Sequence, residues 1–140
     1  IPNLNGIKFT SNNFMEMIEC IRFDGGRFDI LNGFDEMLLC GMAVGARGGV
    51  GSTYNYSLRT YQNIYDAFMA GDLEQARAAQ QESVDIVHVI INHGGGIRGG
   101  KAIMKLVGID CGDCRLPLAP YTEAEIARLD EELRAIGFKK

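Results

Sequence analysis

The chain has 140 residues, enough for one ordinary domain, and a hydrophobic content of 46% can supply its core. Its net charge of -4 at pH 7 argues against nucleic acid or an anionic membrane as the main partner. The sequence has no apolar run long enough to span a bilayer and opens with no basic-then-apolar signal segment, which favours a cytoplasmic protein.

The first predicted strand carries a lysine in its middle. Residues 6–10 form a short apolar run of the length of a buried parallel strand. An ammonium without a partner is among the costliest groups to bury. Lys8 can therefore be a neutral amine able to attack a carbonyl carbon, or a strand-end residue whose stem reaches water.

Strands and single helices alternate as far as residue 71. The predicted elements, in chain order, are a helix over 14–21, a strand over 28–32, a short buried helix over 34–44, a strand over 46–50 and a helix that begins at 51–53 and ends at Gly71. The last of these helices has an apolar stripe of Leu58, Tyr61, Tyr65 and Phe68. Short apolar strands separated by single helices imply a parallel sheet with right-handed crossovers.

From residue 72 onward the sequence predicts helices only. The first is a long helix over 72–92 with Ala76, Val84, Val87 and Ile91 facing inward. A glycine break over 94–96 precedes a short helix over 101–107. Thr122 and Glu125 then cap a last amphipathic helix, which Gly137 ends.

Neither the cysteines nor the histidines have the spacing of a complete metal site. Cys111 and Cys114 have metal or redox spacing, but no second pair completes a zinc site, and a turn of small residues is the simpler interpretation. His88 and His93 are five apart, which does not fit the paired-histidine zinc motif, so we interpret them as structural or surface residues. We expect reduced thiols and no bound metal.

Polar residues gather at the carboxyl ends of the three predicted strands. They are Lys8 and Thr10, then Gly33, Asp35 and Glu36, then Gly51, Ser52 and Thr53. In a parallel α/β barrel, the strand ends and the loops after them line one site. The carboxylates could instead be partners of helix dipoles, and the hydroxyls helix caps. Their coincidence at one face favours a shared site.

The predicted sheet is incomplete. Three parallel strands cannot close a barrel, and alone they would leave apolar edges unpaired. The chain also opens at Ile1, without an initiator methionine and only a few residues before the first strand. We therefore expect it to be part of something longer, or to need a second chain that completes it.

Three motifs resemble those of one enzyme family. They are Gly6-Ile7-Lys8-Phe9-Thr10, Asn32-Gly33-Phe34-Asp35-Glu36 and Gly49-Val50-Gly51-Ser52-Thr53-Tyr54-Asn55. The family is that of the pyruvate-dependent class I aldolases, which includes dihydrodipicolinate synthase and N-acetylneuraminate lyase. The resemblance continues through residues 101–104 and 115–118 and covers essentially the whole chain. The Asp35–Glu36 pair and the third motif are similar to the lyase branch, whereas the synthase branch usually differs at both.

The resemblance implies an α/β fold: the C-terminal part of a (β/α)8 TIM barrel followed by a C-terminal helical extension. By this comparison, residues 1–71 hold barrel strands six to eight with their helices, and residues 72–140 form the extension. The implied partner is a companion chain or segment that carries strands one to five. Because the family usually assembles as a tetramer, a homo- or hetero-oligomer is implied as well.

The same resemblance implies a Schiff-base aldolase that cleaves N-acetylneuraminate, a sialic acid, to pyruvate and N-acetylmannosamine, with no metal or other cofactor. Lys8 falls on the lysine that forms the covalent imine. The positions that hold the sugar acid fall on Thr10, Gly33, Asp35, Glu36 and Ser52. Such residues suit a polyol, because a site built to pair hydroxyls rejects analogues that lack them.

Two parts of the family's mechanism have no counterpart in the chain, by the same resemblance. The catalytic tyrosine belongs to strand five, and the Ser/Thr pair that binds the substrate carboxylate follows strand one. We therefore expect the polypeptide alone to be inactive. Two alternatives stay open: another pyruvate-dependent aldolase, such as a synthase or a 2-keto-3-deoxy sugar acid aldolase, and a non-catalytic half-barrel subunit in which Lys8 is idle.

Overall fold

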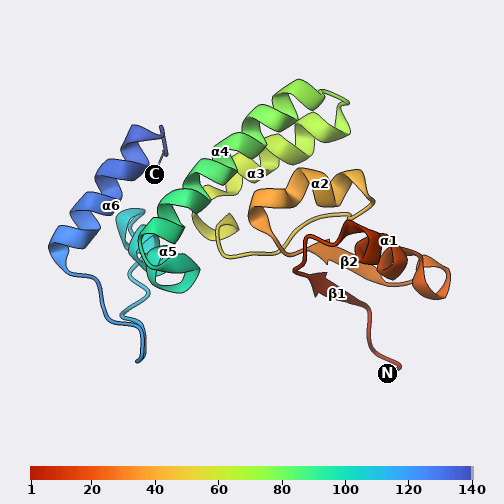
Figure 1. Cartoon of the computed structure of the whole chain (residues 1–140), viewed down its shortest axis with the longest axis horizontal. Coiled ribbons are helices and arrows are strands. Elements are labelled where there is room, and N and C mark those ends of the chain that lie inside the picture. Colours follow the sequence, from red (N-terminus) through yellow and green to blue (C-terminus); the bar gives the residue numbers. More distant parts are fainter. Residues whose placement is uncertain (140) are drawn as a thin grey trace.

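A small parallel sheet lies at one end of the molecule and helices fill the other in the computed structural model, which describes residues 1–139 (Figure 1). Strand β1 (Gly6–Phe9) pairs in parallel with β2 (Asp29–Asn32), and Lys8 stands opposite Leu31. The connection between them is helix α1 (Phe14–Arg22) with a 3-10 turn, η1 (Phe23–Gly26). The first predicted strand–helix–strand unit is confirmed.

The third predicted strand, over 46–50, is wrong in extent, because it is reduced to a single parallel bridge. Asn32 pairs with Gly49 in that bridge. The N–H of Asn32 donates to the carbonyl of Gly48, and the N–H of Val50 donates to the carbonyl of Asn32, both at 2.9 Å. Two adjacent glycines explain the shortening, since they have no side chain to pack and lose more backbone entropy on ordering. The segment still lies beside β2.

The helices confirm the long predicted elements and correct two boundaries. Helices α3 (Tyr54–Met69) and α4 (Leu73–Asn92) lie side by side (Figure 1). Helix α6 (Glu123–Ala135) begins with the predicted capping box. The segment predicted as one helix over 34–44 is a 3-10 turn, η2 (Asp35–Met37), followed by α2 (Leu38–Ala43).

Helix α5 (Gly95–Leu106) starts well before the predicted residue 101. The predicted glycine break is confirmed at Gly94 and Gly95, which both have positive φ, whereas Gly99 within the helix allows close packing against α4. A Cβ added to Gly99 would lie 3.2 Å from Cγ2 of Ile90 on α4. Gly94, the residue before the helix, has φ 90°, a left-handed conformation that favours glycine.

Three apolar clusters hold these elements together. Met17 centres the first, between α1 and β2, and Ile64 belongs to the second, which joins α2, α3 and α4. The third joins α4, α5 and α6 around Ile103, Leu129 and Leu133, each 0% exposed. Helix α4 therefore belongs to two cores and links the strand ends to the C-terminal helices.

The inward faces of α3 and α4 are rotated from the predicted stripes. The buried residues of α3 are Ser57, Tyr61, Ile64 and Ala67, and those of α4 are Ala76, Ala79, Ser83, Ile86, Val89 and Ile90. Leu58 and Ile91, both predicted to face inward, are 53% and 62% exposed. Tyr61 and Ala76 are buried as predicted. The rest of each face was misplaced because alanine and serine fill the close contacts between the helices and carry little hydropathy signal.

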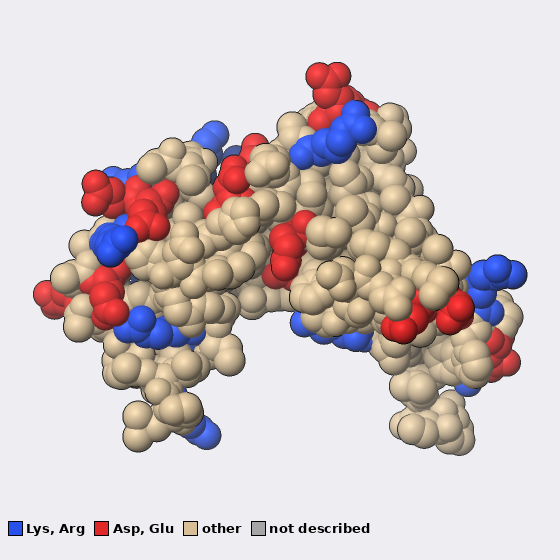
Figure 2. All heavy atoms as spheres, in the orientation of Figure 1, with Lys and Arg blue, Asp and Glu red and all other residues tan. Residues whose placement is uncertain are grey.

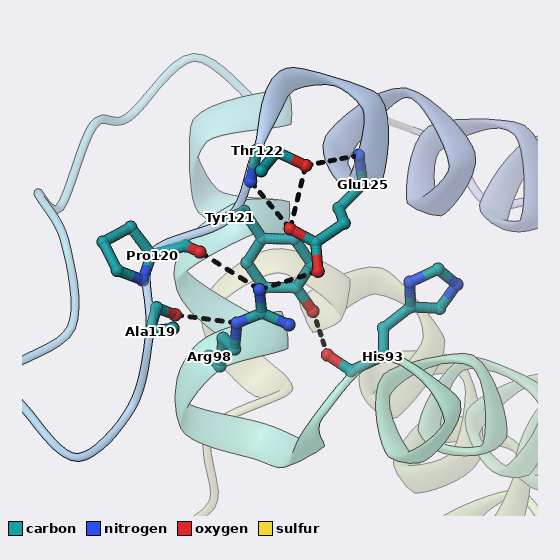
Figure 3. Close-up of polar contacts among 7 residues, drawn as sticks. All are labelled: His93, Arg98, Ala119, Pro120, Tyr121, Thr122 and Glu125. Carbon is teal, nitrogen blue, oxygen red and sulfur yellow. Dashed lines mark hydrogen bonds and ion pairs between the residues drawn. The ribbon is translucent and has the colours of Figure 1, made fainter.

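Arg98 of α5 fastens the segment before α6 to the helices (Figure 3). Its guanidinium donates to the carbonyls of Ala119 and Pro120 at 2.8 and 3.1 Å. It also donates to Oε1 of Glu125 at 2.8 Å. The same group lies 3.8 Å from the ring centroid of Tyr121. These contacts fix the start of α6 against α5.

The histidines and cysteines make no metal site within residues 1–139. Nε2 of His93 lies 3.0 Å from Oε2 of Glu132 on α6, and His88 is exposed. The cysteines are all free, and among the residues that the structure describes no three His, Cys, Asp or Glu side chains come together to hold a metal ion. None of the helices in this part of the chain has the length and apolar character needed to cross a membrane.

Large apolar side chains remain uncovered on β1, α1 and α3. Ile7 of β1 is 41% exposed, Met15 of α1 is 67% exposed and Met69 of α3 is 65% exposed. Acidic and basic side chains are interspersed over the face shown in Figure 2, which is arched along its lower edge between two lobes. A folded chain that exposes this much apolar surface has room for a partner on it.

Candidate active site

The strand ends that the sequence predicted to form one site converge on one cavity of about 240 Å³. From the strand ends, its lining includes Lys8, Gly33, Asp35, Glu36, Gly51, Ser52 and Thr53. Lys8 comes from β1, Glu36 from the turn η2 after β2, and Ser52 from the segment that leads into α3. They meet because parallel strands place their carboxyl ends at the same edge of a sheet.

Gly33 allows Lys8 and Thr10 to lie close to the end of β2. A Cβ added at Gly33 would collide with Oγ1 of Thr10 and lie 3.0 Å from Cε of Lys8. Its N–H donates to the carbonyl of Phe9 at 2.8 Å, which joins the ends of the two strands. Thr10 therefore borders the site beside Gly33, although it is not among the residues that line the cavity.

Lys8 is exposed in this chain, even though its strand is apolar. Its side chain borders the same cavity as Asp35 and Glu36, the acidic residues of the second strand's loop. Within residues 1–139, one side of β1 pairs with β2 and the other has no partner strand. The sequence left two interpretations of Lys8 open, a buried neutral amine and a side chain that reaches water. In this chain by itself the side chain reaches water.

Asp35 is buried, at 6% exposed, and its carboxylate is hydrogen-bonded inside the protein. Oδ2 accepts from the backbone N–H of Thr53 at 3.0 Å and from its Oγ1 at 2.5 Å. Gly51 makes room for this arrangement, because a Cβ there would overlap the carboxylate. Asp35 thus joins the end of β2 to the start of α3, in addition to facing the cavity.

Tyr61 extends this network into the core. Its hydroxyl lies 2.5 Å from Oγ1 of Thr53. Burial raises the pKa of Tyr61, so the hydroxyl stays protonated and can donate to Thr53. Thr53 in turn donates to Asp35. The Tyr61 hydroxyl, which also pairs with Ser83, thus holds the Thr53 side chain in place against the Asp35 carboxylate.

Glu36 differs from its neighbour, because its carboxylate makes no hydrogen bond or ion pair within the described part of the chain. It is half-buried and lines the cavity beside Lys8. A carboxylate in that position can accept hydrogen bonds from a ligand that enters the cavity. Ser52 also lines the cavity and is exposed.

Sequence reasoning missed the part of the site that α4 and α5 supply. Val87, Ile90 and Ile91 of α4, with Gly96 of α5, complete the lining of the cavity. They add apolar side chains to a site whose strand-end residues are mostly polar. The signal was present as an apolar face on α4, but nothing in the sequence places that face at the strand ends.

Comparison with known proteins identifies the family. A model of the dihydrodipicolinate synthetase family matches residues 1–136. The chain belongs to the dihydrodipicolinate synthetase family. This confirms the resemblance inferred from the three motifs.

Its similarity within the family is to N-acetylneuraminate lyases. The chain is 36% identical over 140 residues to N-acetylneuraminate lyase from Mus musculus. This match covers 99% of this chain and 44% of the lyase. The solved Proteus mirabilis N-acetylneuraminate lyase superposes with a TM-score of 0.93 at 38% identity, over 99% of this chain and 47% of that chain. The solved Ruminococcus gnavus sialic acid aldolase, as a catalytic lysine mutant, superposes with a TM-score of 0.87 at 27% identity, over 97% and 45%.

This member of the dihydrodipicolinate synthetase family is thus an α/β chain that spans about half the length of its TIM-barrel relatives. The match covers nearly the whole chain, so both the strand end of the molecule and the helices belong to the family's structure.

Proposed function

We propose that this chain is the C-terminal part of a Schiff-base aldolase of the N-acetylneuraminate lyase type. It supplies barrel strands six to eight from residues 1–71 and a helical extension from residues 72–140. The observation that carries the proposal is the cavity that Lys8, Glu36 and Ser52 share, in a chain similar to N-acetylneuraminate lyases. The description of one structural relative as a catalytic lysine mutant supports a lysine as the reactive group.

Lys8 begins the reaction as a nucleophile. Its neutral amine attacks C2 of the open-chain 2-oxo acid, water leaves, and an iminium forms. The C4 hydroxyl then gives up its proton, the C3–C4 bond breaks, and the electron pair of that bond moves toward the iminium nitrogen. C4 leaves as the aldehyde of N-acetylmannosamine. Protonation at C3 and addition of water to the imine release pyruvate and restore the amine.

The remaining residues hold the substrate while the bond breaks. Glu36 accepts hydrogen bonds from hydroxyls of the sugar tail, and Ser52 pairs with a further oxygen. Thr10, Gly33 and Asp35 shape the cavity around the reacting carbons. The proton acceptor for the C4 hydroxyl comes from outside this chain, which is why the chain alone is expected to be inactive.

A companion chain or segment with strands one to five completes the site. Three observations support it: the chain spans about half the length of its relatives, Lys8 is exposed, and apolar side chains such as Ile7 and Met15 are uncovered. A strand added along the free edge of β1 would enclose Lys8 and exclude water from its amine. The completed barrel then assembles as an oligomer in the cytoplasm.

The test is to co-express the chain with the reading frame directly upstream of its own and to measure pyruvate released from N-acetylneuraminate. We expect release by the pair, and none by this chain alone or by a pair with Lys8→Ala. A pair that condenses pyruvate with another aldehyde but does not cleave N-acetylneuraminate is a different aldolase. A pair that releases no pyruvate and forms no pyruvate adduct is a non-catalytic half barrel and contradicts the proposal.

A further inference from the structure

We infer that Gln80 and Ser83 of α4 are positioning residues for recognition of the sugar tail, because they clamp the turn that carries Glu36. The inference rests on the proposed function, since it concerns how that site selects its substrate. It assigns a role in specificity to a helix outside the three strand–helix units.

The side-chain amide of Gln80 hydrogen-bonds to the turn η2 and to the start of α2 through both its oxygen and its nitrogen. Its Oε1 accepts from the backbone N–H of Leu39 at 2.8 Å. Its Nε2 donates to the backbone carbonyl of Asp35 at 3.4 Å and to Oγ of Ser83 at 3.1 Å. The two backbone groups bound by this one side chain stand on either side of Glu36 in the chain.

Ser83 completes the clamp from the next turn of α4. Its Oγ donates to the same carbonyl of Asp35 at 3.3 Å, and the residue is 0% exposed. A hydroxyl buried in a helix–helix contact costs free energy unless it is hydrogen-bonded. The Ser83 hydroxyl is therefore satisfied by the turn, through the Asp35 carbonyl, and by its neighbours Gln80 and Tyr61.

The turn η2 is thus held from two sides. Helix α4 binds its backbone through Gln80 and Ser83, while Thr53 at the start of α3 binds the Asp35 side chain. Glu36 lies between these anchors, with its carboxylate left for a ligand in the cavity. The place from which its side chain starts, relative to Lys8, depends on the clamp, because the hydrogen bonds at both flanks hold the backbone of the turn.

Lys8 does not share these contacts. It lies on β1, and no hydrogen bond in the described residues joins it to Gln80 or Ser83. Loss of the clamp should therefore weaken the part of the reaction that needs the sugar tail and leave imine formation with pyruvate alone unaffected. A substitution that merely loosened the whole fold would reduce both.

The experiment uses the barrel completed by its companion, with Gln80→Met, which keeps the length of the side chain and removes its hydrogen bonds, and with Ser83→Ala. Gln81→Met is the matched control, because Gln81 is exposed and bonds only to Asp85 on its own helix. We expect KM for N-acetylneuraminate to rise about tenfold in Gln80→Met, as loss of a net hydrogen bond predicts. The rate of borohydride trapping with pyruvate should stay within about twofold of the wild type, and Gln81→Met should change neither.

Hydrogen exchange at the backbone N–H of Leu39 gives a readout that does not depend on catalysis. We expect faster exchange there in Gln80→Met than in Gln81→Met. Unchanged exchange refutes the clamp, as does a fall in pyruvate trapping as large as the effect on the sugar acid. Absence of trapping by the wild-type assembly refutes the proposed function instead, and the exchange rate then still decides the inference.

Discussion

Gly33→Ala should slow imine formation at Lys8 without unfolding the chain. The added methyl would collide with Oγ1 of Thr10 and stand 3.0 Å from Cε of Lys8, so the lysine stem must move. Overpacking of this kind costs about 1–3 kcal/mol. If that cost falls on the reactive position of the lysine, the rate falls by about 5- to 150-fold, at tenfold for each 1.36 kcal/mol.

The assay is the rate of borohydride trapping with pyruvate in the completed barrel. Gly48→Ala is the matched control, because it lies beside the same strand end and an added Cβ would be 3.9 Å from its nearest neighbour, a methyl of Leu31. A thermal melt of both variants separates loss of alignment from loss of folding. Trapping by Gly33→Ala at the rate of Gly48→Ala would refute the packing argument for the site.

Three further predictions concern the substrate tail, the helical core and the attachment of α6. Glu36→Ala should lower kcat/KM for N-acetylneuraminate by about 10- to 150-fold, the loss of one charged hydrogen bond, and leave pyruvate trapping unchanged. Leu133→Ala should destabilise the chain by about 2–5 kcal/mol in urea denaturation, since Leu133 is 0% exposed, whereas Ile136→Ala, at 39% exposed, should cost much less. Hydrogen bonds from Thr122, and then from Arg98, hold the pKa of Glu125 at about 2, below its unfolded value of about 4.3. The stability that Glu125 gives over Glu125→Gln should therefore be complete at pH 6 and disappear as the pH falls toward 2, measured by unfolding midpoints across that range.

The gathering of Lys8, Gly33, Asp35, Glu36 and Ser52 could be predicted because it follows from chain order and one geometric rule. Residues that directly follow successive parallel strands share an edge, whatever the details of the strands. The prediction therefore survived the loss of the third strand, where two glycines leave only one bridge.

The contribution of α4 to the site could not be predicted in the same way. Its position over the strand ends depends on tertiary packing, which small residues such as Ala79 and Ser83 direct without a strong hydropathy signal. Nothing in the sequence marks Gln80, since the backbone groups that it binds lie 41 and 45 residues away in the chain. Similarly, the start of α5 was predicted too late because Gly99 and Gly100 weaken its helical signal, and sequence does not show that α4 lies against Gly99.

The exposure of Lys8 could not be predicted either, because it too depends on tertiary contacts. The sequence indicated an apolar strand around a lysine, which suggested burial of the amine, but burial depends on both edges of the strand being covered. One edge of β1 is paired with β2 and the other is free in the described residues. The chemistry predicted for Lys8 therefore needs surroundings that this chain supplies only in part.

The central claim is that the amine of Lys8 becomes the imine-forming nucleophile when the barrel is complete. The most direct measurement is to reduce the completed assembly with borohydride in the presence of pyruvate and to locate the modified peptide by mass spectrometry. We predict a single adduct on Lys8, with the added mass of pyruvic acid less one oxygen atom. An adduct on any other lysine, or none in the completed assembly, would contradict the claim.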